Sequence, residues 1–293
     1  MIYLYYFKVF ASFSLFLLFS WPKTFAQSDT LASKKREFFP QGQLFLPLVL
    51  DPTECQTHGL LAISSQNNQF FDGLYINASI GFSKGIIRWK AKNTTQELRF
   101  EAAAFMQFEV ENKRRVLGNL INTDYRASVP YIISKGKNQY RLRIFHNSSH
   151  LGDDFLFTRQ VTWYLPNPMN FEQLDFTHSY QEQSIRYYYG AGLVITPYSR
   201  RKRLSFQVGT YYHTPLSQNQ LSAWYWFIGL DLKSMQETDF YPNTKFGVGL
   251  ALKQPRGQFA YLLLEMYQGH LPYSLFERNR TIWVGAGMYW QVW

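Results

Sequence analysis

Apolar and polar side chains alternate one by one along most of the chain after Phe71. In residues 97–111 and 245–253 every second side chain is apolar, and those between are mostly charged, polar or glycine. Successive side chains of a β-strand point to opposite faces, so this period of two predicts strands with one apolar face. Such strands fit an antiparallel barrel with lipid outside and a polar lumen inside.

The alternation predicts an all-β fold: a membrane-spanning, antiparallel up-and-down β-barrel of about 12 strands, with about 10 to 14 compatible with the pattern, closed by the C-terminal strand. If the C-terminus lies in the periplasm, short turns gather at the periplasmic end and longer loops at the outer end. The expected short turns are residues 135–138, 182–183 and 254–256, and the expected long loops are residues 111–123, 149–168 and 268–279. Strands are expected at residues 72–83, 85–91, 97–111, 124–134, 139–148, 169–181, 184–196, 203–213, 222–233, 243–253, 257–267 and 280–293.

The N-terminus has the pattern of a cleaved signal peptide over residues 1–26. Lys8 precedes an uncharged run from Val9 to Trp21, and Thr24 and Ala26 supply small residues before the expected cleavage point. This run is shorter than the roughly 20 apolar residues of a membrane-spanning helix. A retained N-terminal anchor is the alternative interpretation.

Residues 27–70 fit the alternation poorly, so we expect a periplasmic lead-in or a plug there and the barrel over residues 71–293. Pro47 and Pro52 bound an apolar stretch that could pack against the barrel mouth.

Composition agrees with a barrel. Aromatic residues make up 19% of the 293 residues, yet the mean hydropathy is −0.27. In such a barrel, the positive hydropathy of the outward apolar side chains and the negative hydropathy of the inward polar side chains cancel in the mean. A soluble β-sandwich is the alternative fold. Because Cys55 is the single cysteine, no intramolecular disulfide can form.

The formal net charge of +10 is spread over short basic clusters, among them residues 34–36, 114–115 and 200–203. They suit contact with outer-membrane lipid and lipopolysaccharide, with solvated loops as the plainer alternative, and form no nucleic-acid stripe. The last strand resembles the C-terminal signal that the barrel-assembly machinery recognises. That signal ends in an aromatic residue, and this chain ends in Trp293. Strict alternation nevertheless places Trp293 opposite the strand's apolar row.

The densest polar cluster spans residues 146–154. His146 and Ser148 lie two apart on one predicted strand and share a face, as a general base and a nucleophile must. The order His-x-Ser is similar to that of outer-membrane phospholipase A, in which base and nucleophile lie on the lipid-facing wall. The Asn-Gly that follows the nucleophile there is replaced here by Ser149-His150. A wider candidate polar loop site comprises Ser149, His150, Asp153, Asp154 and His270.

Two other interpretations of this cluster stay open. In the first, the serines turn the chain, the histidines bond loop backbone, and Asp153 and Asp154 cap a short helix. In the second, His146, His150, Asp153 and Asp154 bind a metal, although their spacing matches no closed zinc pattern. No phosphate loop or dinucleotide fingerprint appears in the sequence.

Three segments together resemble a bacterial family of undetermined activity, domain of unknown function 1207. They are residues 45–52, with the sequence FLPLVLDP, residues 148–154, with SSHLGDD, and residues 267–270, with YQGH. Asp154 stands where the family has Glu, and Val49-Leu50 stand where it has Ala before Asp-Pro. The resemblance implies an outer-membrane-type barrel and no particular activity.

Two functions are compatible with the sequence. The favoured one is an outer-membrane barrel with a structural, binding or small-solute transport role, since about 12 strands leave a narrow lumen. The alternative is a phospholipase A-like, lipid-acting hydrolase with Ser148 as nucleophile and His146 as base. No cofactor is expected, and calcium enters only with the hydrolase.

Overall fold

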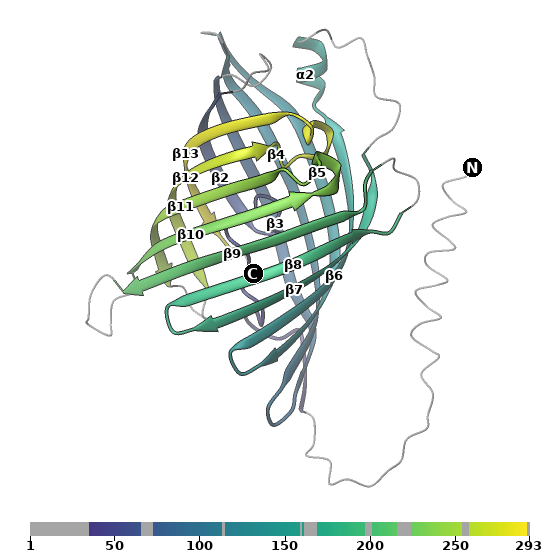
Figure 1. The fold of residues 1–293 in the computed structure, drawn as a ribbon, viewed down its shortest axis with the longest axis vertical. Helices are drawn as coiled ribbons and strands as arrows, with labels where there is room; N and C mark the ends of the chain where they lie inside the picture. The colour runs from purple at the N-terminus through teal and green to yellow at the C-terminus, as the bar shows by residue number, and fades with distance from the viewer. Residues whose placement is uncertain are drawn as a thin grey trace. The chain divides into compact units, whose positions relative to one another are not determined.

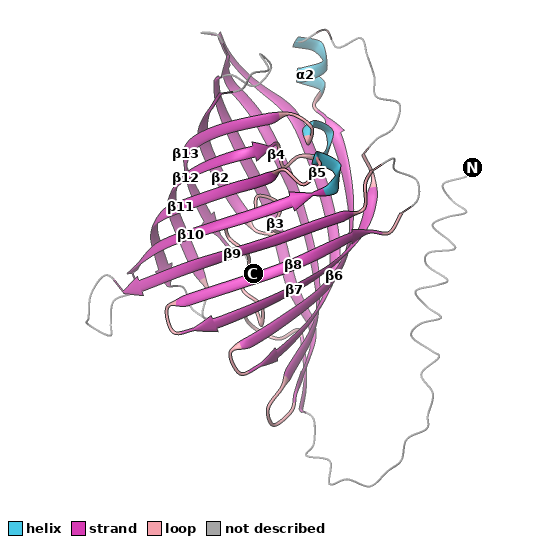
Figure 2. Cartoon of the chain, in the orientation of Figure 1, coloured by secondary structure: helices cyan, strands magenta, loops and turns pink. Residues whose placement is uncertain are grey.

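The computed structural model describes residues 35–65, 73–112, 115–158, 160, 169–196, 201–215, 224–253 and 258–291. The predicted signal peptide and the terminal Trp293 lie outside these residues. The described part is almost entirely β-strand (Figure 2). None of its helices is long and apolar enough to cross a membrane.

Strands β2 to β13 form a closed antiparallel barrel (Figure 1). Each strand pairs with its neighbour in sequence, β13 pairs with β2, and the pairing of β3 with β4 completes the ring. A short extra strand, β1, pairs with the end of β3. The strands are β1 (Lys35–Phe38), β2 (Thr57–Ser65), β3 (Gly73–Lys90), β4 (Thr95–Asn112), β5 (Arg115–Lys135), β6 (Asn138–Leu151), β7 (Phe171–Glu182), β8 (Ile185–Val194), β9 (Leu204–Pro215), β10 (Trp224–Met235), β11 (Pro242–Lys253), β12 (Phe259–His270) and β13 (Arg280–Trp290). The helical turns are α2 (Asp153–Thr158), η2 (Gln236–Thr238) and η4 (Ser274–Phe276).

The predicted fold class is confirmed, and the barrel has the expected twelve strands. Two strand assignments are nevertheless wrong: two predicted strands are one, and one barrel strand was not predicted, so the total stays the same. The expected strands 72–83 and 85–91 are one strand, β3, with a register shift between Gly85 and Ile87. The barrel also begins at β2, inside the segment 27–70 that was assigned to a lead-in or plug. The expected outer loop 111–123 is mostly strand, because β4 continues to Asn112 and β5 starts at Arg115.

The connections divide the barrel into two ends. Tight turns between β3 and β4, β5 and β6, and β7 and β8 gather at one end, here called the short-turn end. The opposite end, the long-loop end, carries α2, η2 and η4 in the connections β6–β7, β10–β11 and β12–β13. This is the asymmetry of outer-membrane barrels, whose long loops face outward.

The two faces of the wall differ as the alternation predicted. Large apolar side chains are exposed on the outer face of nearly every strand, for example Leu142 and Ile144 on β6. The intervening residues of β6, Arg141 and Arg143, point inward and are buried. A polar, charged interior inside an apolar wall suits a barrel that is solvated by lipid.

Candidate functional site

A stretch of chain, residues 40–56, runs inside the barrel and is here called the inner segment; Figure 1 shows it in purple. Its apolar side chains pack against inward-facing aromatic residues of the wall. Gln139 donates a hydrogen bond to the Leu44 carbonyl oxygen at 2.8 Å. Arg186 donates to two further inner-segment carbonyl oxygens at 2.8 and 2.9 Å. The inner segment is therefore attached to the wall by its backbone as well as by its side chains.

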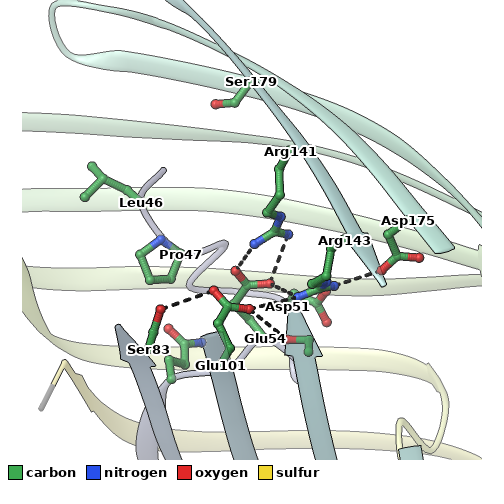
Figure 3. Close-up of polar contacts among 12 residues, drawn as sticks. Leu46, Pro47, Asp51, Glu54, Ser83, Glu101, Arg141, Arg143, Asp175 and Ser179 are labelled. Carbon is green, nitrogen blue, oxygen red and sulfur yellow. Dashed lines mark hydrogen bonds and ion pairs between the residues drawn. The ribbon is translucent and has the colours of Figure 1, made fainter. Parts of the chain in front are cut away.

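A buried ionic network anchors the inner segment near its C-terminal end, at Glu54 (Figure 3). The Glu54 carboxylate accepts hydrogen bonds from Arg141 on β6, and its Oε2 lies 3.4 Å from Nη1 of Arg143. Arg143 also donates to Asp175 on β7 at 2.9 Å. These side chains are almost completely buried, so removing one partner would leave a charge unpaired in a dry interior.

Residues 51–53, here called the tip of the inner segment, are held to the wall through Asp51 and Thr53. Lys233 on β10 lies 3.1 Å from Oδ2 of Asp51, and Arg126 on β5 donates to the Thr53 carbonyl oxygen at 2.6 Å. Cys55 follows this tip, and burial raises the pKa of its thiol to about 12. The thiol therefore stays protonated and unreactive while the inner segment is in place.

Charged side chains also join the loops of the long-loop end. Arg201 pairs with Glu277, and Arg278 pairs with Glu237 at 2.6 Å. Burial raises the pKa of Glu277, and the neighbouring Arg201 opposes that shift. A cavity of about 60 Å³ lies between these loops and the tip of the inner segment. The predicted basic cluster 200–203 thus contributes Arg201 to an ion pair between loops.

A second polar group lies on the outer wall, at the end of β6 nearest the long loops. The outward-facing row of β6 is apolar at Leu142 and Ile144 and then changes to His146, Ser148 and His150. His146 and Ser148 thus share a strand face, as their spacing predicted, and the structure shows that this face is the outer one.

His146 is held by a carboxylate that the sequence did not single out. Its Nδ1 lies 2.8 Å from Oε1 of Glu172, the residue directly opposite on β7. The second carboxylate oxygen of Glu172 accepts a hydrogen bond from the Thr196 hydroxyl, whose oxygen in turn accepts from the Glu172 backbone N–H at 2.7 Å. Since a carboxylate can only accept, Nδ1 carries the proton and Nε2 is left as the acceptor of a singly protonated ring.

Ser148 lies between two histidines on the same face. Its Oγ is 2.8 Å from Nε2 of His150, and the ring of His150 meets the Tyr125 ring at a centroid distance of 5.7 Å. The Ser148 hydroxyl therefore bonds the following histidine, while His146 bonds Glu172. His146 and Ser148 therefore share a face, but each bonds a different partner.

This polar group lies within the apolar wall. The pairing register places Ser148 beside Tyr125, Tyr125 beside Ala104, and Ala104 beside Ile80. Along β4 the outward row continues toward the long-loop end as Met106 and Phe108, so apolar residues extend beyond this level. Ionisable side chains facing hydrocarbon are costly and therefore point to function.

The remaining residues of the predicted loop site are dispersed. Ser149 points inward and donates to Asn122 and Asp124. Asp153 and Asp154 form the first turn of α2. His270 ends β12, where its backbone N–H donates to Asn243. Across the described ranges, no three His, Cys, Asp or Glu side chains are grouped closely enough to hold a metal ion.

Sequence reasoning missed Glu172 and Thr196 although one signal was present. Glu172 occupies an outward position of a predicted strand, in the same row as Leu174 and Phe176. A charged residue in a lipid-facing row is the kind of exception that marks a functional position. Its partner is 26 positions earlier in the chain and could be identified only from the strand register.

The fold defines the class of protein: a twelve-stranded barrel of the outer-membrane type, with a filled interior and a polar group on its outer wall. The chain belongs to the family described as protein of unknown function DUF1207, whose sequence profile matches residues 23–292. No curated protein matches the sequence.

Solved structures of outer-membrane barrels are similar in fold. The Salmonella typhi outer membrane phospholipase, a dimer with bound calcium, matches with a TM-score of 0.53 and 10% identity, over 80% of this chain and 90% of that one. Outer membrane phospholipase A from Escherichia coli matches with a TM-score of 0.52 and 10% identity, over 81% and 98%. An outer membrane channel of Pseudomonas putida F1 has a TM-score of 0.42 and 10% identity, over 90% and 99%. At such identities the likeness shows the fold alone.

Proposed function

We propose that this protein is a lipid-acting serine hydrolase of the outer membrane, with Ser148 as nucleophile, His146 as general base and Glu172 as the residue that orients the base. The observation that carries the proposal is the 2.8 Å contact between Nδ1 of His146 and Glu172 on the lipid-facing wall, two residues from Ser148. A nucleophile, a base and a group that orients the base form the arrangement shared by unrelated serine hydrolases.

The base acts through the ring nitrogen that Glu172 leaves free. In the resting arrangement the Ser148 hydroxyl bonds His150. Rotation about its Cα–Cβ bond to another staggered position turns Oγ toward His146 on the same strand face. Glu172 holds the ring so that Nε2, and not Nδ1, receives the serine proton.

The proposed reaction is hydrolysis of an ester bond of a membrane lipid. Ser148 Oγ attacks the carbonyl carbon while its proton passes to Nε2 of His146. The bond to the alcohol breaks, and the alcohol leaves with that proton. Water then attacks the acyl-serine ester and gives a proton to Nε2, and Ser148 regains the proton as the fatty acid departs. One ester and one water thus yield one carboxylic acid and one alcohol.

The interior supports this proposal over solute transport. The inner segment fills the middle of the lumen, and ion pairs join the loops at the long-loop end. Glu54 of this segment is held inside the barrel by two buried arginines. The outer wall, in contrast, gives Ser148 direct access to lipid.

Phospholipid hydrolysis by the purified, folded protein in detergent micelles, with and without calcium, tests the proposal. We expect fatty acid release by the unaltered protein and loss of at least about 10³-fold in Ser148→Ala. His178→Ala is the matched control, because His178 also faces outward but bonds Asn138 on β6. The proposal would be refuted if Ser148→Ala were as active as the unaltered protein, or if the unaltered protein released no fatty acid.

The same assay identifies the base. We expect His146→Ala to lose about 10²–10⁴-fold, because its role is general base catalysis. His150→Ala should retain more activity, since that ring only holds the resting hydroxyl. If His150→Ala is the more damaging change, His150 is the base and the role given to His146 is wrong.

A further inference from the structure

A shallow groove on the outer wall begins at the proposed catalytic residues. It has a volume of about 420 Å³, and His146 and Ser148 line one of its edges. Its floor is made of three small residues, Ala102 and Ala104 on β4 and Ala127 on β5. The groove is therefore continuous with the catalytic group.

The strand register explains why the wall is hollow at this place. Two neighbouring rows of paired, outward-facing residues run across β3, β4, β5 and β6. One row joins Ile80, Ala104, Tyr125 and Ser148, and the other joins Phe82, Ala102, Ala127 and His146. Large side chains stand at the β3 edge and at Tyr125, while the three alanines leave the space between them open. Since neighbouring strands lie about 4.8 Å apart, the floor is about 10 Å wide.

Apart from its catalytic edge and the inward-facing Arg126, the groove is lined by apolar and aromatic residues. Ile80, Phe82 and Tyr125 are exposed on the outer face, where the surroundings are lipid. Phe100 packs against Phe82 with ring centroids 6.5 Å apart and extends the apolar border. A hydrocarbon chain that lies on the alanines would place the ester at its end beside Ser148.

We infer that this groove binds one acyl chain of the lipid whose ester is attacked by Ser148, so that the substrates are long-chain acyl esters. This inference rests on the proposed hydrolase function and adds its substrate class. The alanine floor selects for chain length, because a longer chain buries more methylene groups while its ester is held at Ser148.

Ala104→Trp tests the inference by filling the floor between Ile80 and Tyr125, and it leaves the catalytic residues themselves unaltered. Ala191→Trp is the matched control, because Ala191 is an exposed outward-facing alanine on β8. Each folded variant is given a dipalmitoyl phospholipid and, separately, p-nitrophenyl butyrate, in the same detergent. We expect Ala104→Trp to lose at least about tenfold on the phospholipid and less than about twofold on the short ester. Ala191→Trp should change neither rate.

Three outcomes would overturn the inference. Equal rates for Ala104→Trp and the unaltered protein on the phospholipid would show that no chain occupies the floor. Equal losses on both esters would show that the alanine floor does not distinguish long from short acyl chains. Equal losses on both esters together with a smaller oligomer than the unaltered protein forms, measured by light scattering, would show that a second copy of the chain covers the groove.

A binding measurement separates failure of this inference from failure of the proposed function. A phospholipid with a photoreactive diazirine in its acyl chain is cross-linked to the Ser148→Ala variant, which needs no catalysis. We expect the peptide containing residues 102–104 to be labelled several-fold more than the peptide around Ala191, and Ala104→Trp to remove that excess. Excess labelling without any hydrolysis would refute only the hydrolase, whereas equal labelling of the two peptides would refute the groove.

Discussion

Glu172 lies directly opposite His146 on neighbouring strands of the outer wall, with 2.8 Å between Oε1 and Nδ1. The side chains of His146 and Glu172 are 49% and 35% exposed, so lipid and not protein surrounds much of this pair. A single hydrogen bond between exposed side chains contributes only about 1 kcal/mol to stability. A carboxylate in a lipid-facing row is therefore explained better by its effect on the imidazole than by its effect on folding.

Replacing Glu172 with Gln should separate these two effects. We expect Glu172→Gln to lower kcat for ester hydrolysis by about 10²–10⁴-fold, because an amide can bond the wrong ring tautomer. The urea midpoint of unfolding should stay close to that of the unaltered protein. A variant with full kcat, or one that loses activity only in proportion to unfolded protein, would contradict the orienting role.

Thr196 should act through Glu172. Thr196→Val keeps the shape of the side chain but removes the hydroxyl that donates to Glu172. We expect a smaller loss of kcat than in Glu172→Gln, with an unchanged KM, since the carboxylate remains but is less well held. A rise of KM at constant kcat would indicate that Thr196 contacts the substrate instead.

The buried ionic network predicts a large stability effect at Glu54. In Glu54→Ala, Arg141 and Arg143 lose a partner inside the barrel. Breaking a buried pair by removing one side costs about 3–5 kcal/mol, so the urea midpoint should fall clearly. Asp239→Asn is a suitable control, because the Asp239 side chain in its ion pair with Lys202 is 86% exposed and Asn tolerates the left-handed backbone at this position (φ 51°). Equal midpoints for the two variants would show that Glu54 does not anchor the inner segment.

Cys55 reports whether the inner segment is in place. The thiol is buried and its pKa is raised to about 12, so it should resist maleimide in the folded protein. In Asp51→Asn with Glu54→Gln, two anchors weaken and the labelling rate should rise by about tenfold or more. Mass spectrometry measures the rate, and the fully unfolded protein gives its upper limit. Rapid labelling of the unaltered folded protein would contradict an inner segment that stays in the lumen.

Most of the wall could be predicted from the sequence because lipid and lumen impose opposite chemistry on alternate residues. The alternation failed to predict strands correctly where one face does not have the expected chemistry or where the register shifts. In β2, the inward-facing Leu60 and Ala62 pack in an apolar cluster, so both faces are apolar and no alternation appears. In β3, the register shift after Gly85 changes the phase of the alternation, and one strand looks like two.

The candidate site was predictable only in part, for a similar reason. Residues two apart on one strand share a face, so His146 and Ser148 could be paired from their spacing. Glu172 depends on the register between β6 and β7, and the inner segment depends on contacts between Glu54 and strand residues 87 and 89 positions away. A local pattern contains no information on such distant pairings.

Covalent labelling with a long-chain alkyl fluorophosphonate tests the central claim most directly, because this reagent reacts only with an activated serine. The folded protein is treated in detergent, and the modified peptide is identified by mass spectrometry. We expect a single adduct at Ser148 in the unaltered protein and in His178→Ala, and at least about 10²-fold slower labelling in His146→Ala. A folded protein that forms no adduct at Ser148, or one that labels as fast without His146, would contradict the account.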